Sequence, residues 1–307
     1  MNIKVVVTVN IGDAWFCNIC IASIRYYYPD VEILILKDEL KGSFSTQELE
    51  TYWNVKRMDY PPNRFGWGSA KFFLLKDPAL EGQFFLLLDS DIVFTGRVLD
   101  KLLPMTGKYD FIISPEYDDN PYTDWATRTY FDVRKTEIEY PDYKYPGYFF
   151  NSGQLLMKAG KLSKEEMELF MDFDNYPYWT RLKDFPMPDQ SMVNFLFAVS
   201  ANKGRARVGA EYQYMIWSES PQYEGKISID DIKDGNKYPQ LMHWAGALRM
   251  PYLNAMSHKN LLIFFEKYYY SKIPMGRLKH FVKDAKAIKD HLPITLYRAL
   301  KRMIRRA

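Results

Sequence analysis

The sequence has few of the features that mark several common protein classes. It contains two cysteines, Cys17 and Cys20, which is too few for a structural zinc site built from two cysteine pairs. No apolar run approaches the roughly 18 residues that a membrane-spanning helix needs. Val5-Val6-Val7 is too short for the apolar core of a secretory signal. We therefore expect the protein to be made and kept in the cytosol.

The two cysteines are spaced as in a redox-active Cys-x-x-Cys motif. They fall inside an expected helix over about residues 13 to 28, where Ile19, Ile21 and Ile24 are their neighbours. Two interpretations stay open, a redox pair or two buried small apolar side chains. The apolar helical surroundings favour the second.

No Gly-x-Gly-x-x-Gly follows the first expected strand, Ile3 to Val9, where the chain has Asn10-Ile11-Gly12-Asp13 instead. That glycine pattern lets a backbone approach a dinucleotide pyrophosphate, so a nicotinamide-dependent enzyme is disfavoured. A sugar-1-phosphate nucleotidyltransferase should carry a glycine-rich, basic loop at the same place, and Asn10-Ile11-Gly12-Asp13 is not such a loop. This enzyme class remains an alternative function.

Alternating strand and helix patterns in the first third predict an α/β fold. Strands are expected at 3–9, 31–37, 55–58 and from 84, with helices at 13–28, 45–53 and 67–76, the second helix starting with Ser45 and Glu48 in capping-box spacing. This order predicts a mostly parallel central sheet flanked by helices, as in a Rossmann-like nucleotide-binding domain. With 307 residues we expect one domain over 1–255 and a helical, basic extension over 256–307.

Later segments are less regular. A strand at 109–114 precedes a stretch to about 148 that is crowded with tyrosine, proline and aspartate. This stretch is either a lid or acceptor-binding segment, or a packed aromatic insertion. Further expectations are a strand over 148–157 interrupted at 151–153, a helix over 163–173, a helix over 191–199 with Asp189 as its N-cap, and a strand over 240–244.

The most informative motif is the apolar run Phe84 to Leu88, which leads directly into Asp89-Ser90-Asp91. A short apolar run of this kind predicts a buried parallel strand, and ligands of α/β sheets bind beyond the carboxyl ends of such strands. Two carboxylates one residue apart can face the same cation, and oxygen donors without thiolates suit Mg²⁺ or Mn²⁺. A second Asp-x-Asp at Asp172 and Asp174 falls in an expected helix, and we expect no role for it.

Four short segments occur in an order that carries a family resemblance. They are Leu88-Asp89-Ser90-Asp91, Phe150-Asn151-Ser152-Gly153, Pro188-Asp189-Gln190, and His243-Trp244-Ala245-Gly246 followed by Arg249. This order resembles the retaining GT-A glycosyltransferases of family 8, which include bacterial lipopolysaccharide galactosyl- and glucosyltransferases and glycogenin. The resemblance covers about residues 3 to 252.

The resemblance implies a metal site. Asp89 and Asp91 match the family's metal-binding pair and His243 its third protein ligand, so the implied cofactor is Mn²⁺ or Mg²⁺. An imidazole beside two carboxylates suits Mn²⁺ better than Ca²⁺. Without the family pattern, a lone histidine after a strand is either a ligand or a hydrogen-bonded core residue.

The resemblance also implies how a nucleotide-sugar donor binds. Gly246 and Arg249 match the turn that contacts the diphosphate, where relatives usually have lysine, and Lys71 sits where relatives tend to place an arginine. Thr8 and Asn10 would face the base. Because this chain departs from the family pattern just after Asn10, UDP as the nucleotide is inherited from the resemblance alone. The remaining donor-binding residues it implies are Ser90, Asn151 and Ser152.

The implied activity is transfer of a hexose from a nucleotide diphosphate sugar to a saccharide or glycolipid acceptor, with retention of anomeric configuration. Asp189 is expected at the sugar hydroxyls and Gln190 near the anomeric carbon. An amide is a poor nucleophile, so front-face transfer is favoured. Glu116 is expected to orient the acceptor hydroxyl. A non-catalytic saccharide-binding or membrane-scaffolding protein on the same fold is a further alternative.

The positive charge is concentrated at the end of the sequence. Residues 276–307 contain ten Lys/Arg and two Asp, a net charge of +8, and the rest of the chain is net negative. Basic residues surround one helical stripe of apolar side chains. The apolar side chains of this stripe are Leu296, Leu300, Met303 and Ile304. This pattern predicts peripheral binding to an anionic membrane, near a lipid-linked acceptor, or else an ordinary solvated helix. Nucleic-acid binding is not expected.

Overall fold

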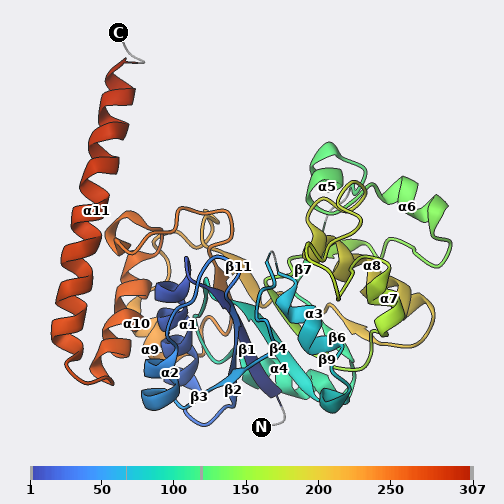
Figure 1. Ribbon diagram of the computed structural model, residues 1–307, viewed down its shortest axis with the longest axis horizontal. Coiled ribbons are helices and arrows are strands. Elements are labelled where there is room, and N and C mark those ends of the chain that lie inside the picture. The colour runs from blue at the N-terminus through green and yellow to red at the C-terminus, as the bar shows by residue number, and fades with distance from the viewer. Residues whose placement is uncertain (1–2, 67, 118–119, 305–307) are drawn as a thin grey trace.

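The protein is built around a seven-stranded sheet (Figure 1). The computed structural model describes residues 3–66, 68–117 and 120–304, and at 117 and beyond 291 only the backbone. The strand order is β10-β6-β9-β4-β1-β2-β3. The strands are β1 (Ile3–Asn10), β2 (Ile33–Asp38), β3 (Val55–Met58), β4 (Phe84–Asp89), β6 (Phe111–Ile112), β9 (Gln154–Lys158) and β10 (Val208–Gly209).

Most neighbouring strands of this sheet run parallel. β4, β1, β2 and β3 are parallel to one another, as are β6 and β10, and β9 runs antiparallel between β4 and β6. Two small sheets lie beside it, one of β11 (Met215–Trp217), β12 (Leu241–His243) and β5 (Ile92–Phe94), the other of β7 (Pro115–Tyr117) and β8 (Tyr148–Phe150). The expected α/β fold with a mostly parallel sheet is confirmed.

Alternate side chains of the central strands point to opposite faces of the sheet and pack into two separate hydrophobic cores. In β1, Val5 and Val7 pack with α1 (Ala14–Tyr27) and α10 (Lys259–Ser271), whereas Val6 faces the other core. That second core contains apolar side chains of α3 (Ala70–Leu75) and α8 (Pro188–Asn202). Because both faces of the sheet are covered, the central strands are apolar throughout, and the polar groups gather at the strand ends.

Several expected helix boundaries are wrong. α2 (Gln47–Tyr52) is preceded by Thr46, and the predicted Ser45/Glu48 capping box does not form. α7 (Lys164–Glu168) ends well before 173, and Asp172 lies in a separate turn, where its carboxylate accepts hydrogen bonds from the Asp174 and Asn175 N–H groups. Asp189 is not an N-cap but lies in the first turn of α8. The expected helix start at Trp67 lies outside the described residues.

The segment from 115 to 148 is more ordered than expected. After β7 it contains α5 (Asp124–Thr129) and α6 (Val133–Glu139), whose N-caps Thr123 and Asp132 accept hydrogen bonds from backbone N–H groups. Tyr130 stacks on Phe149 with ring centroids 4.0 Å apart. Most of this segment is thus helical and aromatic-packed, as the insertion interpretation expected.

Among the remaining elements, η1 (Pro78–Leu80) packs against the second core through Leu80. The side of the molecule that carries α1 is completed by α4 (Val98–Leu102), η2 (Leu103–Gly107), α9 (Ile229–Asp234), η3 (Leu253–Ala255) and α11 (Gly276–Ile304). α11 runs beside α10, and its far end rises clear of the body (Figure 1). No helix among the described residues is long and apolar enough to span a bilayer. The expected stripe of Leu296, Leu300, Met303 and Ile304 lies outside the described side chains.

The two cysteines are free and buried, as the apolar interpretation predicted. Burial raises the pKa of the Cys17 thiol to about 12 and the pKa of Cys20 well above its usual value. Since the thiolate is the reactive form, neither thiol should react with a disulfide reagent such as DTNB in the native protein at pH 8. Both should react once the protein is unfolded in guanidinium. Rapid labelling of the native protein would restore the redox interpretation.

Candidate active site

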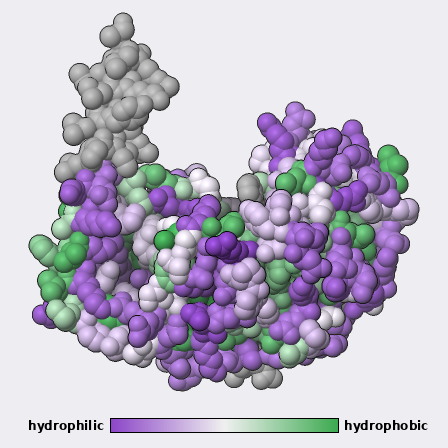
Figure 2. All heavy atoms as spheres, viewed as in Figure 1, coloured by the Kyte–Doolittle hydropathy of each residue, from purple (hydrophilic) through white to green (hydrophobic). Residues whose placement is uncertain are grey.

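A cavity of about 770 Å³ opens at the carboxyl ends of β1, β2 and β4. Figure 2 shows the molecule hollowed between the part that carries α10 and the part that carries α5 to α8. One wall comes from the strand ends and the other from the start of α8 and the segment before it. The lining residues that the sequence singled out are Thr8, Asn10, Asp89, Ser90, Asp91, Asn151, Ser152, Asp189, Gln190, His243, Gly246 and Arg249.

Three candidate metal ligands converge on the cavity floor. Asp89 ends β4, Asp91 follows two residues later, and His243 ends β12. Since β12 pairs antiparallel with β5, His243 lies opposite Ile92, and its Nε2 is 3.2 Å from the Asp91 Oδ1. One ligand atom from each of the three residues lies within 4.8 Å of the others.

These residues fit a divalent ion. Two carboxylates and one imidazole form a donor set of the kind that Mn²⁺ accepts. The Nδ1 of His243 is buried and makes no hydrogen bond within the described residues, while the ring lies stacked on Trp217 with centroids 5.6 Å apart. Packing thus orients the imidazole, and its Nε2 faces the carboxylates.

Gly153 lets the backbone pass directly beside these ligands. A Cβ at this position would lie 2.3 Å from His243 Cε1 and 2.9 Å from Asp89 Oδ2. No real Cβ makes such contacts, so any larger residue must displace the ligands. The glycine of the Asn151-Ser152-Gly153 motif therefore has a steric role.

Buried and half-buried cations balance the carboxylates. The Lys71 Nζ lies 2.7 Å from the Asp89 Oδ1 and also donates to the carbonyl oxygen of Ser152, and the lysine is 1% exposed. Thr8 Oγ1 donates to the same Asp89 oxygen at 3.3 Å. Lys71 is thus part of the site and not a solvated charge on a helix.

Arg249 closes the opposite side of the ligand group. Its guanidinium pairs with Asp91 and lies 3.6 Å from the Asp13 carboxylate. Burial acts to raise the pKa of Asp91, but the nearby His243 and Arg249 outweigh it and hold this pKa below the usual range. Asp91 is therefore anionic at neutral pH.

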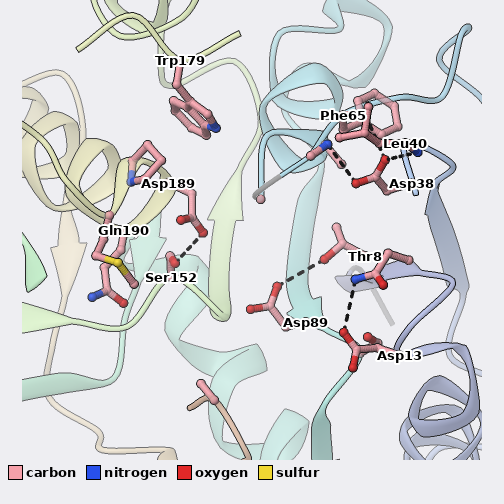
Figure 3. A pocket seen from close by; sticks show the side chains of 18 of the residues that line it. Thr8, Asp13, Asp38, Leu40, Phe65, Asp89, Ser152, Trp179, Asp189 and Gln190 are labelled. Atoms are coloured by element: carbon pink, nitrogen blue, oxygen red, sulfur yellow. Dashed lines mark hydrogen bonds between the residues drawn. The ribbon is translucent and has the colours of Figure 1, made fainter. Parts of the chain in front are cut away.

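Paired side chains form the far wall (Figure 3). Ser152 Oγ donates to the Asp189 carboxylate at 2.8 Å, and Asn151 Nδ2 donates to Gln190 Oε1 at 2.8 Å. Burial raises the pKa of Asp189 above its usual value, and the nearby Lys71 offsets part of this increase. The motif after β8 and the start of α8, far apart in sequence, are held together as one polar surface across the cavity from Asp89.

Glu116 does not line the cavity, unlike the other predicted catalytic residues. It lies on β7, where its carboxylate accepts a hydrogen bond from the Tyr130 hydroxyl at 3.1 Å, and burial raises its pKa. The cavity thus brings together all the predicted metal and donor residues except Lys71, which touches Asp89 from beneath.

Sequence reasoning missed several residues of the cavity. Asp38, the last residue of β2, accepts hydrogen bonds from Leu40, Phe65 and Gly66 N–H groups and fixes two lining loops. Its position at a strand end was a usable indication, since ligands bind at the carboxyl ends of parallel strands. Trp179, which points into the cavity near Asp189, had no comparable indication (Figure 3).

The chain shares its fold with solved glycosyltransferases. The apo structure of the bifunctional glycosyltransferase WbbM aligns with 92% of this chain, at a TM-score of 0.58 and 14% identity, and this chain covers 52% of that protein. The galactosyltransferase LgtC, in complex with donor and acceptor sugar analogues, aligns with 88% of this chain and 97% of its own, at a TM-score of 0.54 and 14% identity. The predicted GT-A fold is confirmed. No family model and no curated protein matches the sequence.

We predict that Gly153→Ala weakens Mn²⁺ binding by roughly tenfold or more, because its Cβ would push His243 and Asp89 apart. Isothermal titration with Mn²⁺ measures this. Gly107→Ala is the matched control, since a Cβ there meets nothing within 4 Å. Equal affinities of the two variants would remove the ligand assignment.

Proposed function

We propose that the protein is a metal-dependent glycosyltransferase that moves a hexose from a nucleotide diphosphate sugar, expected to be a UDP-hexose, to a saccharide or glycolipid acceptor. The observation that carries this proposal is the convergence of Asp89, Asp91 and His243 on the floor of a 770 Å³ cavity. This volume suits a nucleotide-sugar-sized ligand. The GT-A fold supports it independently.

The leaving diphosphate is the group that this site is suited to stabilise. A divalent ion bound at the three ligands would neutralise part of its developing charge. Arg249 adds a planar guanidinium at the edge of the same group and can grip a phosphate with two hydrogen bonds. The turn at Gly246, with φ of 70°, leads the chain from His243 to this arginine. Lys71 adds a buried positive charge behind Asp89.

We assign the sugar to the opposite wall. The Asn151 amide and the Asp189 carboxylate are suited to read hydroxyl groups, and Ser152 fixes the orientation of Asp189. Gln190 is held by Asn151 and is assigned to the side of the anomeric carbon. Trp179 offers an aromatic face nearby, a surface against which the apolar side of a saccharide ring packs well.

We propose front-face transfer with retention. The acceptor oxygen bonds to the anomeric carbon as the bond to the diphosphate oxygen breaks, and the hydroxyl proton passes to the departing phosphate. Gln190 is an amide and a poor nucleophile, so its role is to position the donor. The role of orienting the acceptor stays assigned to Glu116, although its carboxylate, bonded to the buried Tyr130, does not line the cavity.

The nucleotide is assigned to the end of β1. Asn10 is held by hydrogen bonds with Gly12 and Asp13, and Thr8 faces Asp89.

The two alternative functions are less well supported. A nucleotidyltransferase lacks its glycine-rich basic loop in this sequence, and a non-catalytic scaffold has no need of an intact acid–acid–imidazole group.

An anionic membrane is the proposed docking partner, which would place the enzyme peripherally on the inner face of a membrane, near a lipid-linked acceptor. The described part of α11 supports this proposal. Leu278, Phe281, Val282 and Ile288 are 52%, 70%, 56% and 48% exposed along the helix. Arg277, Lys279, Lys286 and Lys289 flank them. Exposed apolar side chains beside cations are suited to the boundary between headgroups and acyl chains.

We predict that Asp91→Ala lowers Mn²⁺-dependent hydrolysis of UDP-hexoses by roughly a hundredfold or more, because a central ligand is lost. A panel of nucleotide sugars, assayed with and without Mn²⁺, measures this, and circular dichroism checks that the variant is folded. Asp174→Ala, in the second Asp-x-Asp, is the control and should keep full activity. Unchanged turnover in Asp91→Ala would contradict the metal-dependent mechanism.

Replacing Phe281 with Asp should weaken binding to phosphatidylserine vesicles by roughly tenfold, since an exposed apolar ring that would insert between the lipids is exchanged for a charge that they repel. Co-sedimentation measures the binding, and activity on a soluble acceptor should stay unchanged. Ile138→Asp provides the matched control, because Ile138 is 83% exposed on α6, far from α11 in Figure 1. Deleting residues 293–307 should act in the same direction as Phe281→Asp. Equal vesicle binding by all these proteins would defeat the docking proposal.

A further inference from the structure

A second group of potential metal ligands joins α10 to α11. Glu266 comes from α10, and His280 and Asp284 come from successive turns of α11. The His280 Nε2 lies 3.0 Å from the Glu266 Oε2 and 3.4 Å from the Asp284 Oδ2. This group is separate from the cavity, whose lining contains none of these residues.

Lys283 does not occupy the space between the three ligand atoms. Its Nζ lies 2.6 Å from the Glu266 Oε1 and 3.4 Å from the Asp284 Oδ1, and it also donates to the carbonyl oxygen of Pro251. Each carboxylate therefore gives one oxygen to Lys283 and turns the other toward the imidazole. One ligand atom from each of the three residues lies within 4.8 Å of the other two.

The single hydrogen on the His280 Nε2 cannot make good hydrogen bonds to both carboxylates at once. An imidazole nitrogen carries at most one hydrogen, so Nε2 can donate one good hydrogen bond, and two carboxylates compete for it. A dication between the three atoms would satisfy all of them at once. Two ligands of a tetrahedral Zn²⁺ ion, each about 2.1 Å from the metal, lie about 3.4 Å apart. The observed distances of 3.0 and 3.4 Å are close to this separation.

The surroundings hold two of the three ligands in place. Glu266 is 5% exposed and is fixed by its ion pair with Lys283. Tyr270 stacks on the His280 ring, with centroids 4.7 Å apart, and holds its orientation. Two carboxylates and one Lys283 ammonium leave one net negative charge beside the imidazole, which favours a dication.

We propose that Glu266, His280 and Asp284 form a second metal site that takes a transition-metal dication of the Zn²⁺ class and fastens α11 to α10. This site goes beyond the proposed transferase activity. It determines how firmly the helix that carries the exposed apolar stripe is attached to the body. The His–x–x–x–Asp spacing on α11 puts two ligands on one helix face, and Glu266 meets them from the neighbouring helix.

The test is hydrogen–deuterium exchange of the intact, chelator-treated protein, with and without Zn²⁺. In the wild type, we expect Zn²⁺ to slow exchange in the α11 peptides over 276–291 by roughly tenfold or more. His280→Gln should lose this protection. Asp284→Asn should lose it too, whereas Asp290→Asn removes the same charge from an exposed position of the same helix outside the group and should keep the protection.

Zinc counts give a second readout. Wild type and Asp290→Asn should each bind one more Zn²⁺ per chain than His280→Gln in equilibrium dialysis. Equal counts, or α11 exchange that does not respond to Zn²⁺ in the wild type, would overturn the proposal. Both readouts are independent of sugar transfer, so their outcome differs from that of the Asp91→Ala assay.

Discussion

The structure depends on the balance of charge at the end of β4. An apolar strand delivers two carboxylates to the junction of two cores, where unpaired anions would be costly. Lys71 reaches Asp89 from beneath, and His243 and Arg249 meet Asp91 from the other side. These partners come from elements far apart in sequence, so the charge balance also specifies how α3, β4 and β12 meet. The same arrangement leaves carboxylate oxygens directed at the cavity.

Predictions from the sequence succeeded where one local pattern determined one outcome. The apolar run before Asp89 required a buried strand, and strands of parallel sheets end at a binding edge, so the position of both carboxylates at the cavity was predictable from chemistry alone. His243 needed the family resemblance, because nothing local shows that β12 pairs with β5. Helix ends were predicted less well, since turns such as the one at Asp172 depend on single side-chain hydrogen bonds. Trp179 enters the cavity through tertiary packing that no local pattern encodes.

Lys71 is buried at the site, for a reason that the sequence does not contain. On an isolated helix this lysine would be solvated, and only the packing of α3 beneath the Asn151-Ser152-Gly153 turn buries it to 1% exposure. Glu116 shows the opposite case. Its place after a strand suggested a role at the acceptor, but β7 belongs to a separate small sheet, and the side chain points to Tyr130.

The residues that line the cavity come from several separate chain segments between Thr8 and Arg249. No contiguous peptide therefore contains all three candidate ligands. The group is complete only after β12, which carries His243, has been synthesised and paired. Nascent chains released early should be unable to hold either ion or nucleotide. Fragment mapping or grafting of a single motif onto another scaffold would fail for the same reason, whereas a circular permutant that keeps every strand pairing could retain the site.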